Sequence, residues 1–417
     1  MKSVFWIIWL VLASLIVLFL ILYSPRIVAY FGGFKKRARL HNEKHNQIAV
    51  LVPARDESAT ISSLLSSLKR QDYEEFDVFV IVKNPKDPTI KMVEDAGFTC
   101  FVDVEQHAKS DALDFALSRI LRKNRNKYDA YLILDADTGI KDDYLYQMNE
   151  AMASKRDVIV SKKIVKNYFM GKGSLSLQGA CNGYIWSFFD DMGNAYRSDH
   201  NIALFTVGSG LLLSKRIILA NNGWAYKDTI TEDCELFGDM IANHWTSYYA
   251  AYAPIYMEEA PTLSMTNKRR TRWMTGLTDS QKLYQNKAFG MGSFWDLYFD
   301  YSIYLVYLYF EVLGSSVLFH LVSAVVLFFM GSGELTLALY GLLGSLGVIY
   351  LSFFFPSFIA FLLSFKDIKG HFFFRLAVCF LVPLHYLGYY SIMGKVFLGV
   401  SSHSWDSISR VKENKNV

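Results

Sequence analysis

Two aspartates on either side of one alanine follow directly after an apolar run of strand length. The run is residues 131–134, and the triplet is Asp135-Ala136-Asp137. Two carboxylates at a strand end can share a divalent cation and the phosphates that it carries, because hard oxygen ligands suit Mg²⁺ and Mn²⁺. Alone the triplet is a weak signal, since aspartates in solvated turns are common.

A second acidic group and an arginine-rich segment lie further along the chain. Glu232 and Asp233 follow Thr231, and residues 269–273 read RRTRW. A metal-binding pair, a separate carboxylate and paired guanidinium groups are the parts needed to transfer a glycosyl group from a sugar diphosphate. The metal and the arginines neutralise the departing diphosphate, while the separate carboxylate takes the proton of the acceptor hydroxyl.

Short strands that alternate with helices must position these groups. Apolar, β-branched runs of strand length are found at residues 48–52, 78–82, 131–134 and 158–160. Helical spacing of apolar residues is found at 58–69 and 110–121. This alternation predicts an α/β domain with a parallel sheet covered on both faces. Ligands bind at the carboxyl ends of such strands, where the aspartate triplet lies.

Long apolar runs at both ends of the chain predict membrane helices. Residues 5–23 carry no charge, and such a run is long enough to cross about 30 Å of hydrocarbon. The basic cluster after it predicts that the following domain is cytoplasmic. Four complete crossings would leave the basic tail outside, so we expect the last run to be re-entrant or broken at Pro383 and Gly388.

The predicted organisation therefore has four parts. They are an N-terminal transmembrane helix at 1–34, a soluble domain at 48–290, interfacial and transmembrane helices at 291–400, and a cytoplasmic tail at 401–417.

Composition agrees with a membrane protein and excludes other classes. The 417 residues are 52% hydrophobic and 20% charged, too apolar for a wholly soluble chain. A formal net charge of +4 without a concentrated basic face argues against nucleic-acid binding. The four cysteines have no paired spacing, so we expect buried structural thiols rather than disulfides or a zinc site.

The motifs together resemble those of membrane-embedded family-2 glycosyltransferases, the group that includes bacterial cellulose, hyaluronan and poly-N-acetylglucosamine synthases. The resemblance covers most of the chain. Its segments are VPARDE at 52–57, KSDAL at 109–113, the aspartate triplet, GSG at 208–210, TED at 231–233 and RRTRW. It implies a GT-A (Rossmann-like) fold, an inverting transfer, a nucleotide-sugar donor, and Mg²⁺ or Mn²⁺ as the cofactor.

The resemblance also implies a role for each motif residue. Asp233 would be the general base, with Glu232 beside it in the catalytic motif. Asp135 would contact the nucleotide and Asp137 the metal. The remaining substrate-binding positions are Pro53, Glu57, Lys109, Gly208, Arg269, Arg272, Trp273, Trp405 and Arg410.

Within that set, the roles differ. Arg269 and Arg272 would face the diphosphate, and Trp273 would form the floor under the acceptor sugar, unless it is an interfacial anchor. Gly208 would lie in a turn that lets the acceptor approach the backbone closely. Trp405 and Arg410 would belong to a cytoplasmic tail that covers the donor.

The implied activity is processive synthesis. A UDP-sugar would be polymerised into a β-linked exopolysaccharide, which would be translocated across the plasma membrane. Lys83 stands where the family usually has an aspartate that contacts the base, so the nucleotide stays open. The main alternative is a single transfer to a membrane lipid, as in ceramide glucosyltransferase-like proteins. A catalytically inactive assembly subunit is a third possibility.

Overall fold

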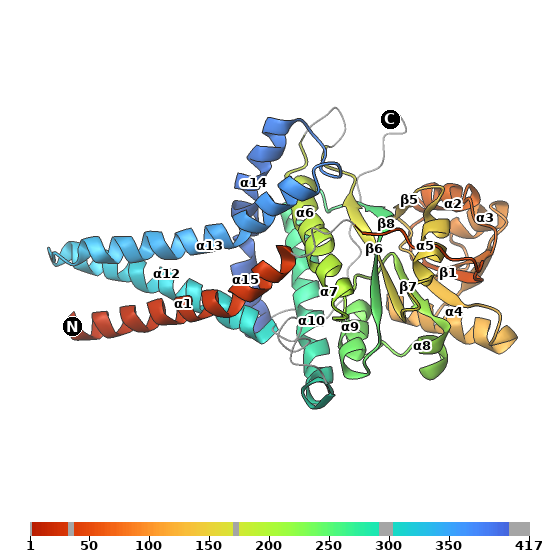
Figure 1. The fold of residues 1–417 in the computed structure, drawn as a ribbon, viewed down its shortest axis with the longest axis horizontal. Coiled ribbons are helices and arrows are strands. Elements are labelled where there is room, and N and C mark those ends of the chain that lie inside the picture. The colour runs from red at the N-terminus through yellow and green to blue at the C-terminus, as the bar shows by residue number, and fades with distance from the viewer. Residues whose placement is uncertain (1, 32–36, 170–174, 292–302, 400–417) are drawn as a thin grey trace.

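The computed structural model describes residues 2–31, 37–169, 175–291 and 303–399. Figure 1 shows an α/β domain on one side and long helices that project away from it on the other. The long helices are α1 (Lys2–Phe31), α12 (Ile303–Phe329) and α13 (Leu335–Leu363).

The α/β domain is built on one eight-stranded sheet with the order β3-β2-β1-β4-β7-β6-β8-β5. The strands are β1 (Ile48–Pro53), β2 (Phe76–Val82), β3 (Thr99–Val102), β4 (Ala130–Ile133), β5 (Gly139–Ile140), β6 (Val158–Val165), β7 (Leu211–Ser214) and β8 (Ser247–Met257). Strands β1 to β4 pair in parallel, as predicted. The predicted strands run in one direction, but the sheet is mixed because β7, which was not predicted, runs antiparallel to both β4 and β6.

A glycine turn leads into β7. Gly210 has a φ of +69°, a left-handed conformation that glycine adopts without steric cost, and β7 begins at the next residue. The N–H of Gly210 donates to the carbonyl of Ile133 at 2.9 Å, so the turn is fixed against the end of β4. The loop before β7 is thereby held at the carboxyl end of β4.

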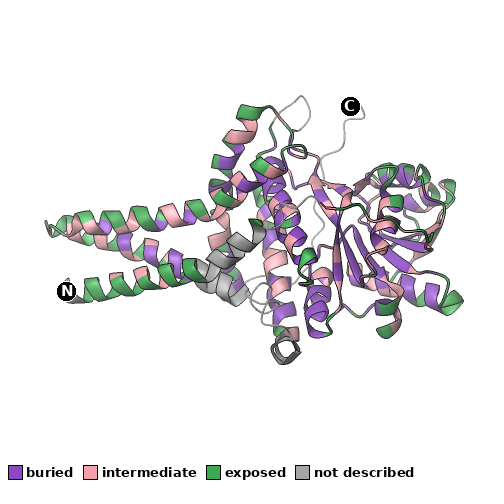
Figure 2. Ribbon diagram, in the orientation of Figure 1, coloured by how far each residue is buried: buried purple, intermediate pink, exposed green. Residues whose placement is uncertain are grey.

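Alternate residues of the central strands bury into two different cores. On β1, Ala49 and Leu51 pack in one cluster with α4 (Lys109–Asn124), whereas Ile48, Val50 and Val52 pack in the other with α2 (Ile61–Lys69). Figure 2 shows the strands buried throughout the centre of the domain. Burial of each valine, leucine or isoleucine side chain among them stabilises the fold by about 1.5–3 kcal/mol. The remaining helices of the domain are α3 (Thr89–Asp95), α5 (Tyr144–Met152), α6 (Leu177–Phe188), α7 (Ala195–Asp199), α8 (Lys215–Ala220) and α9 (Glu232–Ala242), with a π-helical turn η3 (Phe189–Asn194).

Four segments of the described helices are long and apolar enough to span a membrane. They are Val4–Ile21, Glu311–Phe329, Leu335–Leu363 and Phe372–Val396. In Figure 1, α1, α12 and α13 project together, whereas the last segment runs across their base beside α10 (Leu263–Met291).

The last segment is broken, as predicted. Helix α14 (Phe372–Tyr386) ends just before α15 (Gly388–Phe397) begins, so the break falls at Leu387. Pro383 does not interrupt the helix, because it lies inside α14. Whether the segment re-enters the membrane stays a prediction.

Candidate active site

One partly buried lysine brings together motifs from four parts of the chain. Lys109 is the first residue of α4, and its Nζ donates to Oδ1 of Asp135 and to the carbonyl of Gly208, each at 2.6 Å. The same Nζ lies 3.2 Å from Oε1 of Glu232. The two carboxylates raise the pKa of Lys109 above its ordinary value, against the opposing effect of burial. A permanent positive charge therefore sits between the aspartate triplet and the TED motif.

Asp233 lies in the first turn of α9 and contacts the backbone of Gly208, which Lys109 also contacts. Its Oδ2 accepts from the N–H of Gly208 at 2.8 Å, and its Oδ1 accepts from the N–H of Cys234 at 2.9 Å. Burial and the charge of Glu232 raise the pKa of Asp233 to about 6, although Lys109 opposes the shift. A carboxylate with a pKa near the operating pH is suited to be a general base.

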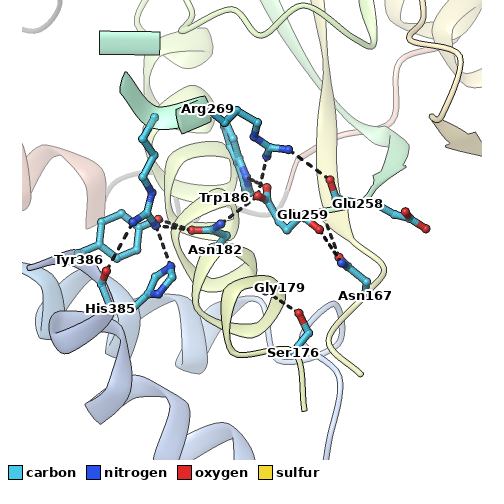
Figure 3. A network of polar contacts seen from close by, with 11 residues as sticks. Asn167, Ser176, Gly179, Asn182, Trp186, Glu258, Glu259, Arg269, His385 and Tyr386 are labelled. Atoms are coloured by element: carbon cyan, nitrogen blue, oxygen red, sulfur yellow. Dashed lines mark hydrogen bonds and ion pairs between the residues drawn. The ribbon is translucent and has the colours of Figure 1, made fainter. Parts of the chain in front are cut away.

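The two arginines of the RRTRW motif on α10 lie in different surroundings. Burial lowers the pKa of Arg272, and the charges of Glu232 and Asp233 oppose that effect, which shows that Arg272 lies near the acidic cluster. Arg269 instead pairs with Glu259, with Nη2 and Oε2 2.5 Å apart (Figure 3). Its guanidinium also lies over the ring of Trp273, 4.6 Å from the centroid.

A family model described as "Glycosyl transferase family group 2" matches residues 131–365, which include the aspartate triplet, TED and RRTRW. The chain belongs to this glycosyltransferase family. The predicted family is therefore confirmed.

Two curated relatives of this glycosyltransferase are named poly-beta-1,6-N-acetyl-D-glucosamine synthase. The Staphylococcus epidermidis protein is 25% identical over 250 residues, 58% of this chain and 57% of the relative. The Staphylococcus aureus (strain COL) protein is 24% identical over 263 residues, 61% of this chain and 60% of the relative. The chain thus spans less than two thirds of these relatives.

A solved structure confirms the fold of the glycosyltransferase. The mannosyltransferase PcManGT from Pyrobaculum calidifontis, in complex with GDP-Man and Mn²⁺, superposes with a TM-score of 0.56 at 15% identity. The superposition covers 93% of this chain and 99% of that one. The predicted GT-A fold is therefore correct, with the mixed sheet described above.

The positions that the sequence predicted to face the nucleotide lie in loops at the carboxyl ends of β1 and β2. Pro53 ends β1, and Glu57 follows it, where its Oε2 accepts from the hydroxyl of Thr60 at 2.6 Å. Lys83 directly follows β2. Asp87 lies two residues before α3 and accepts from the N–H of Thr89 at 2.8 Å. Trp405 and Arg410 lie outside the described residues.

The aspartate triplet fits a metal that takes part of its coordination from the substrate. Within the described ranges, no group of three or more His, Cys, Asp or Glu side chains forms a metal site. Asp135 and Asp137 lie in one turn after β4, closed by the N–H of Thr138 donating to the carbonyl of Asp135 at 3.0 Å. Two carboxylates can hold Mg²⁺ or Mn²⁺ when diphosphate and water supply the other oxygens.

Three residues behind the arginine motif have contacts that sequence patterns did not indicate. The Oε1 of Glu259 accepts from the indole N–H of Trp186 at 2.8 Å, and its Oε2 accepts from the amide of Asn182 at 2.9 Å. Glu259 follows β8 and precedes Pro261, and its place just beyond a strand end was the available signal. Its partners on α6 are distant in sequence, so spacing could not reveal them.

Gly208 has no room for a side chain, because the groups of the site fill the space beside it. A Cβ would lie 2.8 Å from Nζ of Lys109 and 2.9 Å from Oε1 of Glu232. We therefore expect Gly208→Ala to lower the transfer rate by about 100-fold, the typical effect of displacing catalytic groups by about 1 Å. Initial rates with a labelled nucleotide sugar would measure this.

The matched control is Gly344→Ala on α13, where an added Cβ meets nothing within 4 Å. Its rate should equal that of the wild type. A Gly208→Ala rate equal to that of this control would show that the lysine and the carboxylates tolerate displacement.

Proposed function

We propose that this glycosyltransferase inverts the anomeric centre of a nucleotide sugar, with Asp233 as the general base. Asp233 takes the proton of an acceptor hydroxyl, and the oxygen attacks the anomeric carbon as the bond to the diphosphate breaks. The position of Asp233, half-buried beside Glu232 and hydrogen-bonded to the N–H of Gly208, with a pKa of about 6, is the observation that carries the proposal. Arg272 and Lys109 stabilise the charge of the departing diphosphate.

A divalent cation at Asp137 and Asp135 would act as a Lewis acid on the diphosphate oxygens. Asp135 also stays in contact with Nζ of Lys109, so the lysine and the cation would share its two oxygens. The loops that carry Pro53 and Glu57 would then hold the nucleoside at the same edge of the sheet.

A UDP-sugar is the proposed donor, and the names of the relatives point to N-acetylglucosamine. The product would be a β-linked polysaccharide that is extended repeatedly and moved across the plasma membrane. Apolar segments on both sides of the catalytic domain support this location, and the basic residues after α1 support a cytoplasmic catalytic domain.

Transfer of one sugar to a membrane lipid is the second candidate. The packing of the long helices favours it, since α12 lies along α13 and α1 contacts α12. Large apolar side chains such as Leu318, Phe329 and Leu343 face outward from these helices. A lipid acceptor could approach such a surface laterally, whereas a polymer would need a continuous polar path.

An assay with radiolabelled donors would distinguish polymer synthesis from transfer of one sugar to a lipid. Purified protein in lipid vesicles would be given Mn²⁺ with labelled UDP-N-acetylglucosamine, UDP-glucose or GDP-mannose, and the product would be sized from the earliest times. We expect incorporation from UDP-N-acetylglucosamine into long chains while most of the donor remains. A single labelled sugar on a solvent-extractable lipid would support the second candidate, and no transfer from any donor would contradict both.

A further inference from the structure

Glu259 is a buried carboxylate that holds three side chains from two helices. It is 3% exposed and accepts from Arg269 on α10 and from Asn182 and Trp186 on α6 (Figure 3). Its own backbone is fixed by Asn167, whose Oδ1 accepts from the N–H of Glu259 at 2.9 Å and whose Nδ2 donates to its carbonyl at 2.8 Å. Such complete hydrogen bonding fixes the position of the carboxylate.

Arg269 cannot leave this carboxylate without a large cost. Among the described ion pairs, the only cationic partner of Glu259 is Arg269, and the other two donors are neutral. If Arg269 swung away to bind a diphosphate, a buried carboxylate would lose its counter-charge, which is strongly unfavourable. Arg272 lies on the same helix, which packs along α9, where Glu232 and Asp233 lie in the first turn.

Arg269 and Trp186 together fix the ring of Trp273. The guanidinium of Arg269 lies over one face of the ring, and the ring of Trp186 meets it at 77° with the centroids 5.9 Å apart. The side chain of Trp273 is only partly buried, and the apolar face of a pyranose suits an aromatic ring. Glu259 holds both neighbours of Trp273 through its two oxygens.

The same network also contacts the last apolar segment, at the end of α14. Oδ1 of Asn182 accepts from Nη2 of Arg270 at 2.8 Å and from the hydroxyl of Tyr386 at 2.9 Å. Arg270 also lies 2.8 Å from Nε2 of His385, at the end of α14. Helix α10 is therefore fixed on two sides, with Arg269 toward Glu259 and Arg270 toward α14.

We propose that Glu259 is a positioning residue that fixes an acceptor platform made of Arg269, Trp186 and Trp273. Arg269 then serves the acceptor side of the site, and Arg272 is the arginine of the motif that faces the diphosphate. The inference rests on the proposed function and deepens it, because it assigns two arginines of one motif to two different substrates.

Measurements of nucleotide binding would distinguish the roles of Arg269 and Arg272. Calorimetric titrations with UDP and with GDP, each with Mn²⁺, would compare the full-length wild type with Arg269→Gln, Arg272→Gln and Glu259→Gln. We expect Arg272→Gln to weaken binding by about tenfold or more, as for a lost charge-assisted contact. Arg269→Gln and Glu259→Gln should stay within about twofold of the wild type, since their contacts lie away from the diphosphate. Equal weakening in Arg269→Gln and Arg272→Gln would overturn the assignment.

A second measurement, independent of nucleotide binding, reports whether the ring of Trp273 is held in place. Fluorine NMR of protein with 5-fluorotryptophan would give its resonance, assigned through Trp273→Phe. We expect Glu259→Gln to shift or broaden it, and Glu259→Asp to restore it in part because the charge remains. An unchanged resonance in Glu259→Gln would overturn the proposal.

This readout does not depend on turnover. If the wild type bound neither nucleotide, the proposed function would be contradicted. The Trp273 resonance would still test whether Glu259 positions the acceptor platform. If the single variants do not fold, the double variant Glu259→Gln with Arg269→Gln removes both charges together and should retain UDP binding. Loss of UDP binding in a folded double variant would also overturn the assignment.

Discussion

Asp233→Asn is expected to abolish sugar transfer while leaving nucleotide binding close to that of the wild type. The asparagine side chain has nearly the same shape as the aspartate. Its oxygen can still accept from the N–H of Gly208, which lies 2.8 Å from Oδ2 of Asp233 in the wild type. It cannot take a proton, so the rate should fall by about 10²- to 10⁴-fold, the range for a lost general base. Initial rates and UDP titrations on the same preparation would measure both effects.

The pH dependence of the wild type provides a second test of the same assignment. Burial and Glu232 raise the pKa of Asp233 to about 6, so the base is protonated below that pH and ionised above it. Transfer should therefore rise with pH through about 6 and level off above it. The control is Asp142→Asn, because Asp142 is an exposed carboxylate that pairs with Arg70. Substantial turnover in Asp233→Asn, or a profile without this rise, would remove Asp233 from the role.

The elements that carry the motifs could be predicted because their signals are local. The apolar run before Asp135 was expected at residues 131–134 and is the strand β4 at Ala130–Ile133. Lys109 was expected near a helix start and begins α4. Parallel strands bring their carboxyl ends to one edge, so the nearness of these groups followed from the fold.

The second half of the sheet was harder to predict because its order depends on distant contacts. Strand β7 has only four residues, and its place between β4 and β6 depends on pairing with strands that are distant in sequence. Strand β8 contains Pro254 and several alanines, and its register with β6 shifts between Ser161 and Lys162. Neither strand shows a clear alternation of apolar and polar residues, which is the usual signal.

The partners of the arginines could not be predicted from the motif alone. Arg269 and Arg272 are three residues apart on α10, so both lie on one side of the helix. Which carboxylate each one meets depends on where β8 ends and on where α9 begins. The sequence resemblance grouped both arginines with the diphosphate, whereas the structure places Glu259 beside Arg269.

Lys109→Met should also have a large effect, because it removes the cation at the centre of the acidic cluster. Nζ lies 2.6 Å from Asp135 and 3.2 Å from Glu232, and methionine keeps the length without the charge. Removing one group that stabilises the charge developing in a transition state typically lowers the rate by about 10²- to 10³-fold. Solvent screens the partly exposed Asp135, so we expect the lower end, roughly a 100-fold lower kcat/KM.

The pH profile distinguishes this charge effect from a loss of packing. Lys109 lowers the pKa of Asp233, so without it that pKa should move further above 6, and the acidic limb of the rate profile should move to higher pH. Lys109→Arg keeps the charge and should keep the limb in place, whereas Lys282→Met, at an exposed lysine, should change neither rate nor profile. A Lys109→Met enzyme with an unmoved limb would show that the ammonium group does not set the basicity of Asp233, and the lysine would then act on the diphosphate alone.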